Sequence, residues 1–402
     1  MPLDVVTGNH AAGHALSLAA EANRTGRGCA CGIYPITPQT EIVERVAAFP
    51  FSKGRVVAVE SEHSAMGVTM GASAAGARSF TASSSNGIAY MVENIMVAGF
   101  YRLPVVMVTV NRTLGPPWNI WADQGDTLML RDFPWIQLYA TDNQEMHDLV
   151  LLAFRMAEDH RILLPVLVSM DAFIVSHTQA ETDLATQEQV DAYLPDLDLP
   201  QRLDGENPRA LGSMVWPAAT VTHRREIDEA MGRVPQVLRE CRARFLEVFE
   251  RDPGGAMTCL WTSDADTILV ASATVATTAR RVVERRRAEG QRVGLVTMRL
   301  FRPFPGEALR TACRPAQRVG VLDRDYAAGM GGIWAQDVKA EFYGTDGPLI
   351  QDYLLGVGGG DVTPDQIERI LDDLTGRPAA GPPVWADLAE WESPTPDAEV
   401  PA

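Results

Sequence analysis

The chain has 402 residues and carries 35 Lys and Arg against 52 Asp and Glu, which gives a formal net charge of −17. At about 150 residues per domain, this length predicts two or three domains. Hydrophobic residues make up 46% of the chain and charged residues 22%, a composition typical of a folded protein and not of a coiled coil or a disordered chain. The negative charge would repel the phosphates of nucleic acid and an anionic membrane surface, so we expect neither as a partner.

The sequence contains no pattern typical of a membrane-spanning helix, a secretory signal or a metal site. The longest stretch without a charged residue, Val5 to Ala20, contains His10 and His14 and does not approach a spanning helix. No basic residue precedes an apolar run at the first residues, so we expect no secretory signal and a cytoplasmic location. The cysteines form no CxxC pair, which argues against an iron–sulfur or zinc site held by this chain alone. They are Cys29, Cys31, Cys241, Cys259 and Cys313.

The first part of the chain alternates strand-like and helix-like segments. Short apolar runs predict strands, and longer runs with apolar residues three or four apart predict helices. Because strands separated by helices indicate a parallel sheet covered on both faces, we expect one α/β domain over residues 1–178. The expected strands are 32–34, 56–60, 79–82, 103–110 and 165–170, and the expected helices are 11–22, 64–77, 87–101 and 143–159.

A connection and a second α/β domain follow. Residues 179–259 begin as an irregular surface segment and continue as a charged linker helix from Arg224 to Arg251, which Pro235 should break or kink. From 260 to 376 the alternation resumes and predicts a smaller open sheet. Residues 377–402 are rich in proline and acids, and we expect an extended or disordered tail. The expected strands of the second domain are 267–271, 292–297 and 318–322, and its helices are 275–289, 332–342 and 364–374.

Four segments with polar side chains come directly after predicted strands of the first domain. In an open parallel sheet, ligands bind at the carboxyl ends of the strands. Taken singly, each segment has a structural explanation, since acids and serines cap helix starts and an arginine after a strand often forms a surface ion pair. The segments are Tyr34–Thr40, Ser61–His63, Thr81–Gly87 and Asn111–Arg112.

Taken together, these segments belong to a longer ordered series of motifs. The series is Tyr34-Pro35-Ile36-Thr37-Pro38, Ser61-Glu62, Phe80-Thr81-Ala82-Ser83, Asn111-Arg112, Asn119-Ile120-Trp121, Asp126, Arg131-Asp132, Trp135-Ile136-Gln137, Phe301-Arg302-Pro303-Phe304-Pro305 and Asp323-Arg324. In this order and spacing it resembles the α subunit of 2-oxoacid:ferredoxin oxidoreductases, most closely the pyruvate and oxalate branch, over most of residues 5–345. The resemblance implies an α/β fold in which a parallel-sheet thiamine pyrimidine-binding domain is followed by a smaller transketolase C-terminal-like α/β domain.

The resemblance also implies a reaction, the thiamine diphosphate-dependent oxidative decarboxylation of a small 2-oxo acid, with electrons passed to ferredoxin. The substrate would be pyruvate or a close analogue such as oxalate. The cofactor's aminopyrimidine needs a carboxylate on one ring nitrogen to remove the C2 proton, and by resemblance that carboxylate is Glu62. Thr37 and Arg112 would orient the carbonyl and the carboxylate of the substrate. The further cofactor-binding candidates are Pro35, Ile36, Ser83 and Ser84, and no metal ligand is expected.

A part of the expected site is missing from this chain. Thiamine enzymes commonly bind the diphosphate through magnesium with a Gly-Asp-Gly motif, and that string does not occur in the sequence. By resemblance, a β subunit supplies the diphosphate site, the magnesium and an iron–sulfur cluster, while γ and δ functions complete electron transfer to ferredoxin, and coenzyme A is a candidate co-substrate. The chain alone is therefore expected to be inactive.

Three other functions stay open at this stage. A partner without a cluster would make this chain a subunit of a non-oxidative thiamine-dependent 2-oxoacid decarboxylase or carboligase. The joint presence of Thr37, Glu62 and Arg112 argues against a catalytically silent assembly subunit. A Rossmann dehydrogenase is disfavoured because no GxGxxG follows a strand, and Gly329-Met330-Gly331-Gly332 lacks the spacing.

Overall fold

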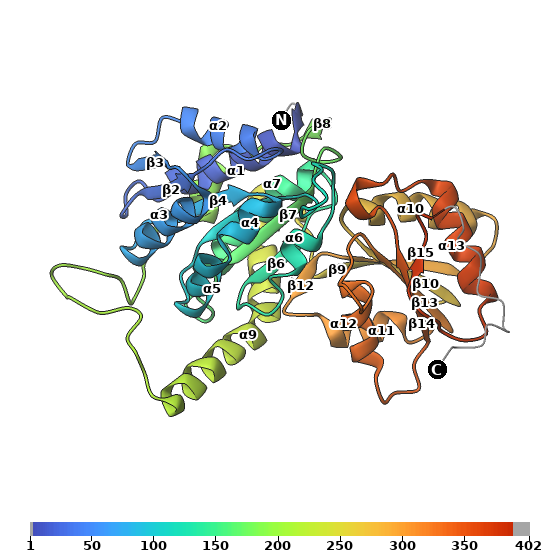
Figure 1. Ribbon diagram of the computed structural model, residues 1–402. Helices are drawn as coiled ribbons and strands as arrows, with labels where there is room; N and C mark the ends of the chain where they lie inside the picture. The colour runs from blue at the N-terminus through green and yellow to red at the C-terminus, as the bar shows by residue number, and fades with distance from the viewer. Residues whose placement is uncertain (1–2, 389–402) are drawn as a thin grey trace. The chain divides into compact units, whose positions relative to one another are not determined.

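The structure, a computed structural model, describes residues 3–388, which divide into two compact units (Figure 1). Unit 1 extends to Thr258 and also includes the later segment Met298–Pro305. Unit 2 consists of Cys259–Thr297 and the chain from Gly306 onwards. The chain therefore leaves unit 1, returns to it once and then completes unit 2.

A seven-stranded sheet forms the centre of unit 1. Neighbouring strands are parallel, with the exception of the antiparallel edge pair β12 and β6, so the predicted parallel α/β architecture is confirmed. A separate antiparallel pair consists of β1 (Asp4–Thr7) and β8 (Gln179–Thr182). In spatial order the seven strands are β12 (Leu300–Arg302), β6 (Ile136–Tyr139), β7 (Val166–Asp171), β5 (Val106–Asn111), β4 (Arg78–Ser83), β2 (Cys29–Ile33) and β3 (Gly54–Ala58).

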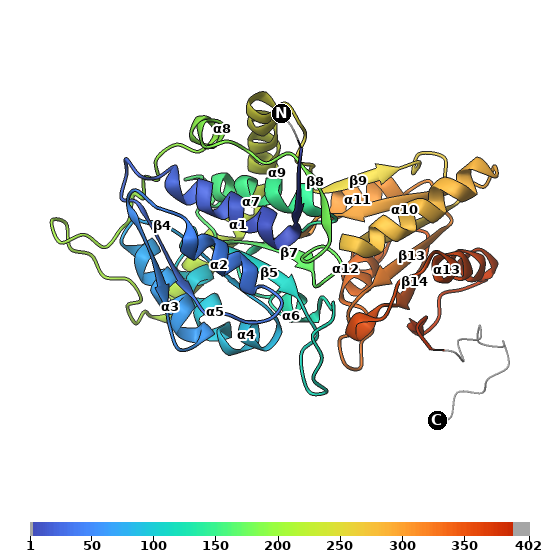
Figure 2. The ribbon, with the colours of Figure 1, turned by 90° about the horizontal axis from the view of Figure 1, so that it is seen from above.

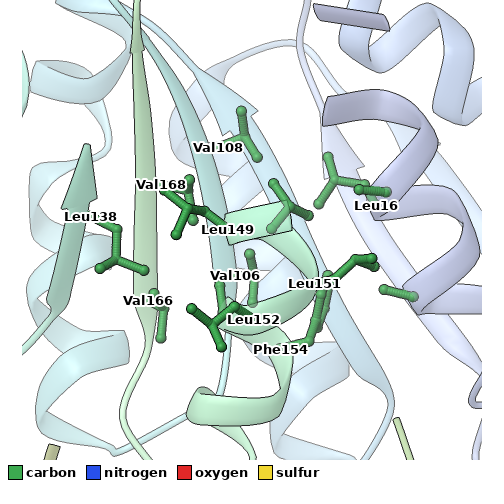
Figure 3. Close-up of a cluster of buried hydrophobic side chains, with 14 of the residues drawn as sticks. Leu16, Val106, Val108, Leu138, Leu149, Leu151, Leu152, Phe154, Val166 and Val168 are labelled. Atoms are coloured by element: carbon green, nitrogen blue, oxygen red, sulfur yellow. The ribbon is translucent and has the colours of Figure 1, made fainter. Parts of the chain in front are cut away.

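Helices cover both faces of this sheet (Figure 2). Successive side chains of a strand point to opposite faces, so Val106 and Val108 pack against Leu149 on one side (Figure 3), while Met107 joins a second buried cluster on the other. The first face carries α1 (Gly8–Glu21), α2 (Thr40–Ala48) and α7 (Asn143–Ala157), and the second carries α3 (Glu62–Ala74), α4 (Ser85–Tyr90) and α5 (Val92–Phe100). The expected single helix 87–101 is thus two helices that meet at Met91.

A long helix, α9 (Pro217–Phe249), packs with α8 (Gln187–Tyr193) on the outside of α7. It starts earlier than the expected Arg224 and continues through Pro235, so of the predicted break or kink the break is wrong. Pro235 is exposed, whereas a buried stripe on the opposite side of the helix is held by the core of unit 1. Tertiary packing of that stripe outweighs the missing hydrogen bond of the proline.

A six-stranded sheet forms the centre of unit 2. Its central pairs, β10 with β13 and β13 with β14, are parallel, as expected for a second α/β domain. In spatial order the strands are β15 (Val384–Trp385), β14 (Leu349–Leu354), β13 (Arg318–Asp323), β10 (Thr267–Ser272), β11 (Val293–Met298) and β9 (Met257–Leu260). The helical segments are α10 (Ala273–Ala288), α11 (Gly306–Cys313), α12 (Ile333–Phe342), η1 (Val357–Gly359) and α13 (Pro364–Gly376).

Two segments of the second half differ from the expected boundaries. The motif around Phe301 was expected inside the domain 260–376, but Leu300–Arg302 adds a strand to the sheet of unit 1, where Leu300 is fully buried. The tail 377–402 is ordered in its first part, because Val384–Trp385 pairs with β14 and Asp387 accepts hydrogen bonds from the backbone N–H groups of Gly356 and Val357. Residues 389–402 lie outside the described part of the chain.

Within residues 3–388, no helix has the length and hydropathy needed to cross a membrane.

Candidate active site

Four strand ends of the unit 1 sheet bring the predicted site residues to one edge. The loop with Thr37 follows β2, Glu62 follows β3, Ser83 ends β4 and Arg112 follows β5. These strands are parallel and neighbour one another in the order β5, β4, β2 and β3, so their carboxyl ends lie together. The segments that the sequence singled out are therefore contributed by adjacent strands of one sheet.

Glu62 begins helix α3 at this edge. Ser61 caps the helix by accepting a hydrogen bond from the Ser64 backbone N–H, which fixes the direction of the first turn. The Glu62 side chain is buried, with 8% of its surface exposed. No group within residues 3–388 donates a hydrogen bond to its carboxylate. A buried acceptor of this kind is available to a donor that comes from outside the chain.

The turn from β4 into α4 lies against Glu62. A side chain at Gly87 would come within 2.6 Å of Ser83 Oγ and 2.7 Å of Glu62 Oε1, so glycine at this position lets the turn approach the carboxylate. The hydroxyls of Ser83 and Ser84 are buried and have no hydrogen-bond partner among the described residues. Ser85 has a φ of 48°, an unfavourable backbone conformation for a residue with a side chain. The turn thus presents unsatisfied polar groups beside Glu62.

Arg112 reaches from the end of β5 to the loop after β2. Its Nη1 donates a hydrogen bond of 2.6 Å to the carbonyl oxygen of Thr37, while its Nε is buried without a partner. Burial lowers the pKa of the Arg112 guanidinium, and the nearby carboxylates of Asp126 and Glu62 oppose that shift. Arg112 thus interacts with two other residues predicted from the sequence: it donates a hydrogen bond to the backbone of Thr37, and its charge interacts with that of Glu62.

The loop that carries Thr37 is held by two buried amides, Asn9 and Gln39, to which the sequence assigned no role. Asn9 donates to the carbonyl oxygen of Pro38 at 2.7 Å, and Gln39 donates to that of Tyr34 at 2.8 Å. Both side chains are fully buried. Asn9 lies at the start of an otherwise largely apolar helix, and a polar residue at that position was the signal that could have identified it. Pro35 and Thr37 are exposed, and Ile36 is half-buried.

A fully buried carboxylate, Asp126, was noted in the sequence only as part of the resemblance. It lies in the short helix α6 (Gly125–Leu128), and its Oδ2 accepts hydrogen bonds from the backbone N–H groups of Ser85 and Arg112. Among residues 3–388, no group of three or more His, Cys, Asp or Glu side chains is arranged to hold a metal ion.

Two family models match the chain. Residues 26–243 match the thiamine diphosphate-binding model of pyruvate flavodoxin/ferredoxin oxidoreductases, and residues 265–367 match core domain II of pyruvate:ferredoxin oxidoreductases. The first match alone spans more than half of the chain.

Curated relatives cover almost the whole chain. The pyruvate synthase subunit PorA of Methanothermobacter thermautotrophicus is 39% identical over 381 residues, which are 92% of this chain and 95% of the relative. The ketoisovalerate oxidoreductase subunit VorA of Pyrococcus horikoshii is also 39% identical, over 92% of this chain and 93% of the relative.

Solved structures support the fold. A 2-oxoglutarate:ferredoxin oxidoreductase from Magnetococcus marinus superposes with a TM-score of 0.72 at 21% identity over 92% of this chain, which spans 65% of that longer chain. A split-gene transketolase superposes with a TM-score of 0.55 at 14% identity over 92% of this chain and 98% of that one. On the family models and the curated relatives together, the chain belongs to the 2-oxoacid:ferredoxin oxidoreductase family, as a counterpart of its PorA and VorA subunits.

Proposed function

We propose that this chain is the α subunit of a complex that oxidatively decarboxylates a small 2-oxo acid, pyruvate or a close analogue such as oxalate, and passes the electrons to ferredoxin. The observation that carries the proposal is a group of polar side chains at the carboxyl edge of unit 1. The hydroxyls of Ser83 and Ser84 and the Nε of Arg112 are buried without a partner, and the nearly buried Glu62 carboxylate lies beside them. Such groups cost free energy in the free chain and are consistent with a polar ligand that satisfies them.

These residues fit thiamine diphosphate by their chemistry. Glu62 would accept a hydrogen bond from a ring nitrogen of the aminopyrimidine, and the Ser83 and Ser84 hydroxyls would bond to polar atoms of the same ring. Pro35 and Ile36 supply apolar surface in the loop beside them. When bound, thiamine diphosphate supplies the carbon nucleophile that adds to the 2-oxo carbon and takes up the electron pair when carbon dioxide leaves.

Arg112 and Thr37 would orient the substrate. The guanidinium forms charge-assisted hydrogen bonds with a carboxylate, and the Thr37 hydroxyl can donate to the carbonyl oxygen of the 2-oxo acid. Very tight binding of the carboxylate would stabilise the ground state and oppose its loss as carbon dioxide. The single backbone hydrogen bond from Arg112 to Thr37 supports a role in orientation, because it limits where the guanidinium can lie.

The remaining parts of the machinery would come from partner chains. The sequence contains no Gly-Asp-Gly string, which supports a β subunit that holds the diphosphate through magnesium and carries the iron–sulfur cluster, with γ and δ functions beyond it. Coenzyme A is the candidate acyl acceptor, and the assembly would work in the cytoplasm.

Replacement of Glu62 by Gln in the assembled complex tests this function. Glutamine keeps the size of the side chain but removes its negative charge, so hydrogen–deuterium exchange of the cofactor's C2 proton should slow by about a hundredfold or more. Glu60→Gln is the matched control, because Glu60 is exposed two residues away and accepts a side-chain hydrogen bond from Ser64. Exchange at the wild-type rate in Glu62→Gln would assign the role to another carboxylate.

A further inference from the structure

A buried carboxylate joins two of the turns at the candidate site. Asp126 is completely buried, and its Oδ2 accepts hydrogen bonds from the backbone N–H groups of Ser85 at 2.8 Å and Arg112 at 3.0 Å. Its Oδ1 accepts one from Asn111 Nδ2 at 2.7 Å. No Arg, Lys or His side chain within residues 3–388 forms an ion pair with it. A buried carboxylate is costly without a cation, so backbone and amide donors replace the lost water.

Both backbone groups belong to turns that carry site residues. Ser85 follows the unsatisfied Ser83 and Ser84, and its positive φ has to be held by its surroundings. The Ser85 hydroxyl also donates to the carbonyl oxygen of Thr113, the residue after Arg112. Asp126 therefore lies where the turn after β4 meets the turn after β5.

We propose that Asp126 is a positioning residue, whose carboxylate fixes the backbone at Arg112 and Ser85 and thereby sets the place of the Arg112 guanidinium at the substrate. This inference rests on the proposed function, because it assumes that Arg112 binds the 2-oxo acid. Asp126 itself is fully buried and is not assigned a contact with substrate or cofactor.

The same network can respond to pH. Burial raises the pKa of Asp126 to about 7, with a smaller contribution from the Asp123 carboxylate, while hydrogen bonds from Arg112, Asn111 and Ser85 oppose the rise. The charged groups that face Asp126 are Asp123 from its own loop and Arg112 from the end of β5, and α4 presents only the uncharged Ser85.

Asn111 offers an acceptor for the protonated form. Its Oδ1 is buried without a partner, and rotation of the amide would present this oxygen to a protonated Asp126. Only the ionised carboxylate accepts all three hydrogen bonds. The turn with Arg112 should therefore be held less firmly as the pH falls below about 7, and kcat/KM for the 2-oxo acid should fall with it.

A double-mutant cycle in the assembled complex tests whether Asp126 acts through Arg112. Asp126→Leu should lower kcat/KM at pH 8 at least tenfold, mainly through KM. In an Arg112→Ala background the same change should cost less than twofold, because the group that it positions is already absent. Asp198→Asn is the control, since Asp198 is an exposed carboxylate outside the candidate site and should leave kcat/KM unchanged. Equal losses from Asp126→Leu in both backgrounds would overturn the positioning role.

The pH dependence of kcat/KM gives a second test, which can be carried out even if Asp126→Leu does not fold. Asp126→Asn keeps an oxygen for the Ser85 and Arg112 N–H groups but has no proton to exchange. The wild-type decline of kcat/KM near pH 7 should be absent from this variant. An unchanged decline would overturn the pH part of the proposal.

Amide hydrogen exchange in the chain alone, without cofactor or substrate, separates failure of this inference from failure of the proposed function. At pH 8 the amides of Ser85 and Arg112 should exchange at least tenfold faster in Asp126→Leu than in the wild type. Unchanged exchange would refute the role of Asp126 whatever the substrate. If instead Arg112→Ala left 2-oxo acid turnover intact, the proposed role of Arg112 would fail while the exchange result stood.

Discussion

At the scale of single residues, the candidate site contains polar groups that the folded chain leaves unsatisfied. Ser83 Oγ, Ser84 Oγ and Arg112 Nε are buried without partners, and the Glu62 carboxylate receives no hydrogen bond within the described residues. Each such group costs about 1–3 kcal/mol when it is fully desolvated. A polar ligand at this edge would recover part of that cost through new hydrogen bonds.

Arg112 is the residue whose replacement should affect the substrate most. Loss of a charged hydrogen-bond partner of a buried carboxylate costs about 2–5 kcal/mol. Arg112→Ala should therefore lower kcat/KM for the 2-oxo acid by about thirtyfold to several thousandfold and leave thiamine diphosphate affinity nearly unchanged. Steady-state kinetics and a cofactor titration of the complex measure the two effects. Arg225→Ala, which removes an exposed arginine paired with Glu229 on α9, is the control. Equal losses of substrate handling and cofactor affinity would mark Arg112 as structural.

At the scale of elements, the site depends on where strands end and helices begin. Glu62 is the first residue of α3 and Ser85 the first of α4, and both helices pack on the same face of the sheet. Parallel neighbours turn the carboxyl ends of β2, β3, β4 and β5 to one edge. A shift of one residue in any of these turns would move its side chain away from the others.

In helix α9, the stability gained by packing can be compared with the stability lost because proline is a poor helix former. Pro235 lies inside the helix on its exposed side and lacks a backbone N–H, which costs up to about 3 kcal/mol in a helix interior. Pro235→Ala should therefore raise the free energy of unfolding of unit 1 by about 1–3 kcal/mol, as measured by urea unfolding followed by circular dichroism. Pro217→Ala is the matched control, because proline is well tolerated in the first turn. A lower stability in Pro235→Ala would mean that the proline ring makes a contact that alanine cannot replace.

At the scale of the whole molecule, the chain carries the candidate site of unit 1 and has no Gly-Asp-Gly string for a diphosphate. Unit 1 supplies the polar edge, and its sheet includes Leu300–Arg302, a segment that interrupts unit 2 in the sequence. The net charge of −17 argues against nucleic acid as the missing partner. The subunit names of the relatives point instead to a multi-subunit oxidoreductase.

Activity of the isolated chain tests the shared site. The purified chain with thiamine diphosphate, magnesium and a 2-oxo acid should release no carbon dioxide above the background rate. Reconstitution with its β partner should give release that depends on an added electron acceptor. Release at the same rate without acceptor, with an aldehyde as product, would favour the non-oxidative alternative. Activity of the chain alone would refute the shared site.

Much of this architecture is determined by the sequence itself. The order of strands and helices follows from runs of apolar residues, because a buried strand and an amphipathic helix each need a regular apolar pattern. The strand-end segments with Thr37, Glu62, Ser83 and Arg112 were recognisable because ligand sites of parallel sheets occupy those positions. Their grouping at one edge then follows from the parallel order of β5, β4, β2 and β3.

Other features depended on long-range packing, which no local pattern reports. Leu300–Arg302 is too short to show a strand period, and only an open sheet edge at β6 makes it a strand of unit 1. By sequence alone Pro235 predicts the end of a helix, but packing of the buried stripe of α9 on the core of unit 1 keeps the helix continuous. The proposed role of Asp126 emerges only when two turns distant in the sequence, at Ser85 and Arg112, both donate to its Oδ2. Local sequence thus determined the helices and strands and the polar residues at their ends. Tertiary structure decided which of these polar residues form hydrogen bonds with one another, because such bonds need short distances between segments that are far apart in the sequence.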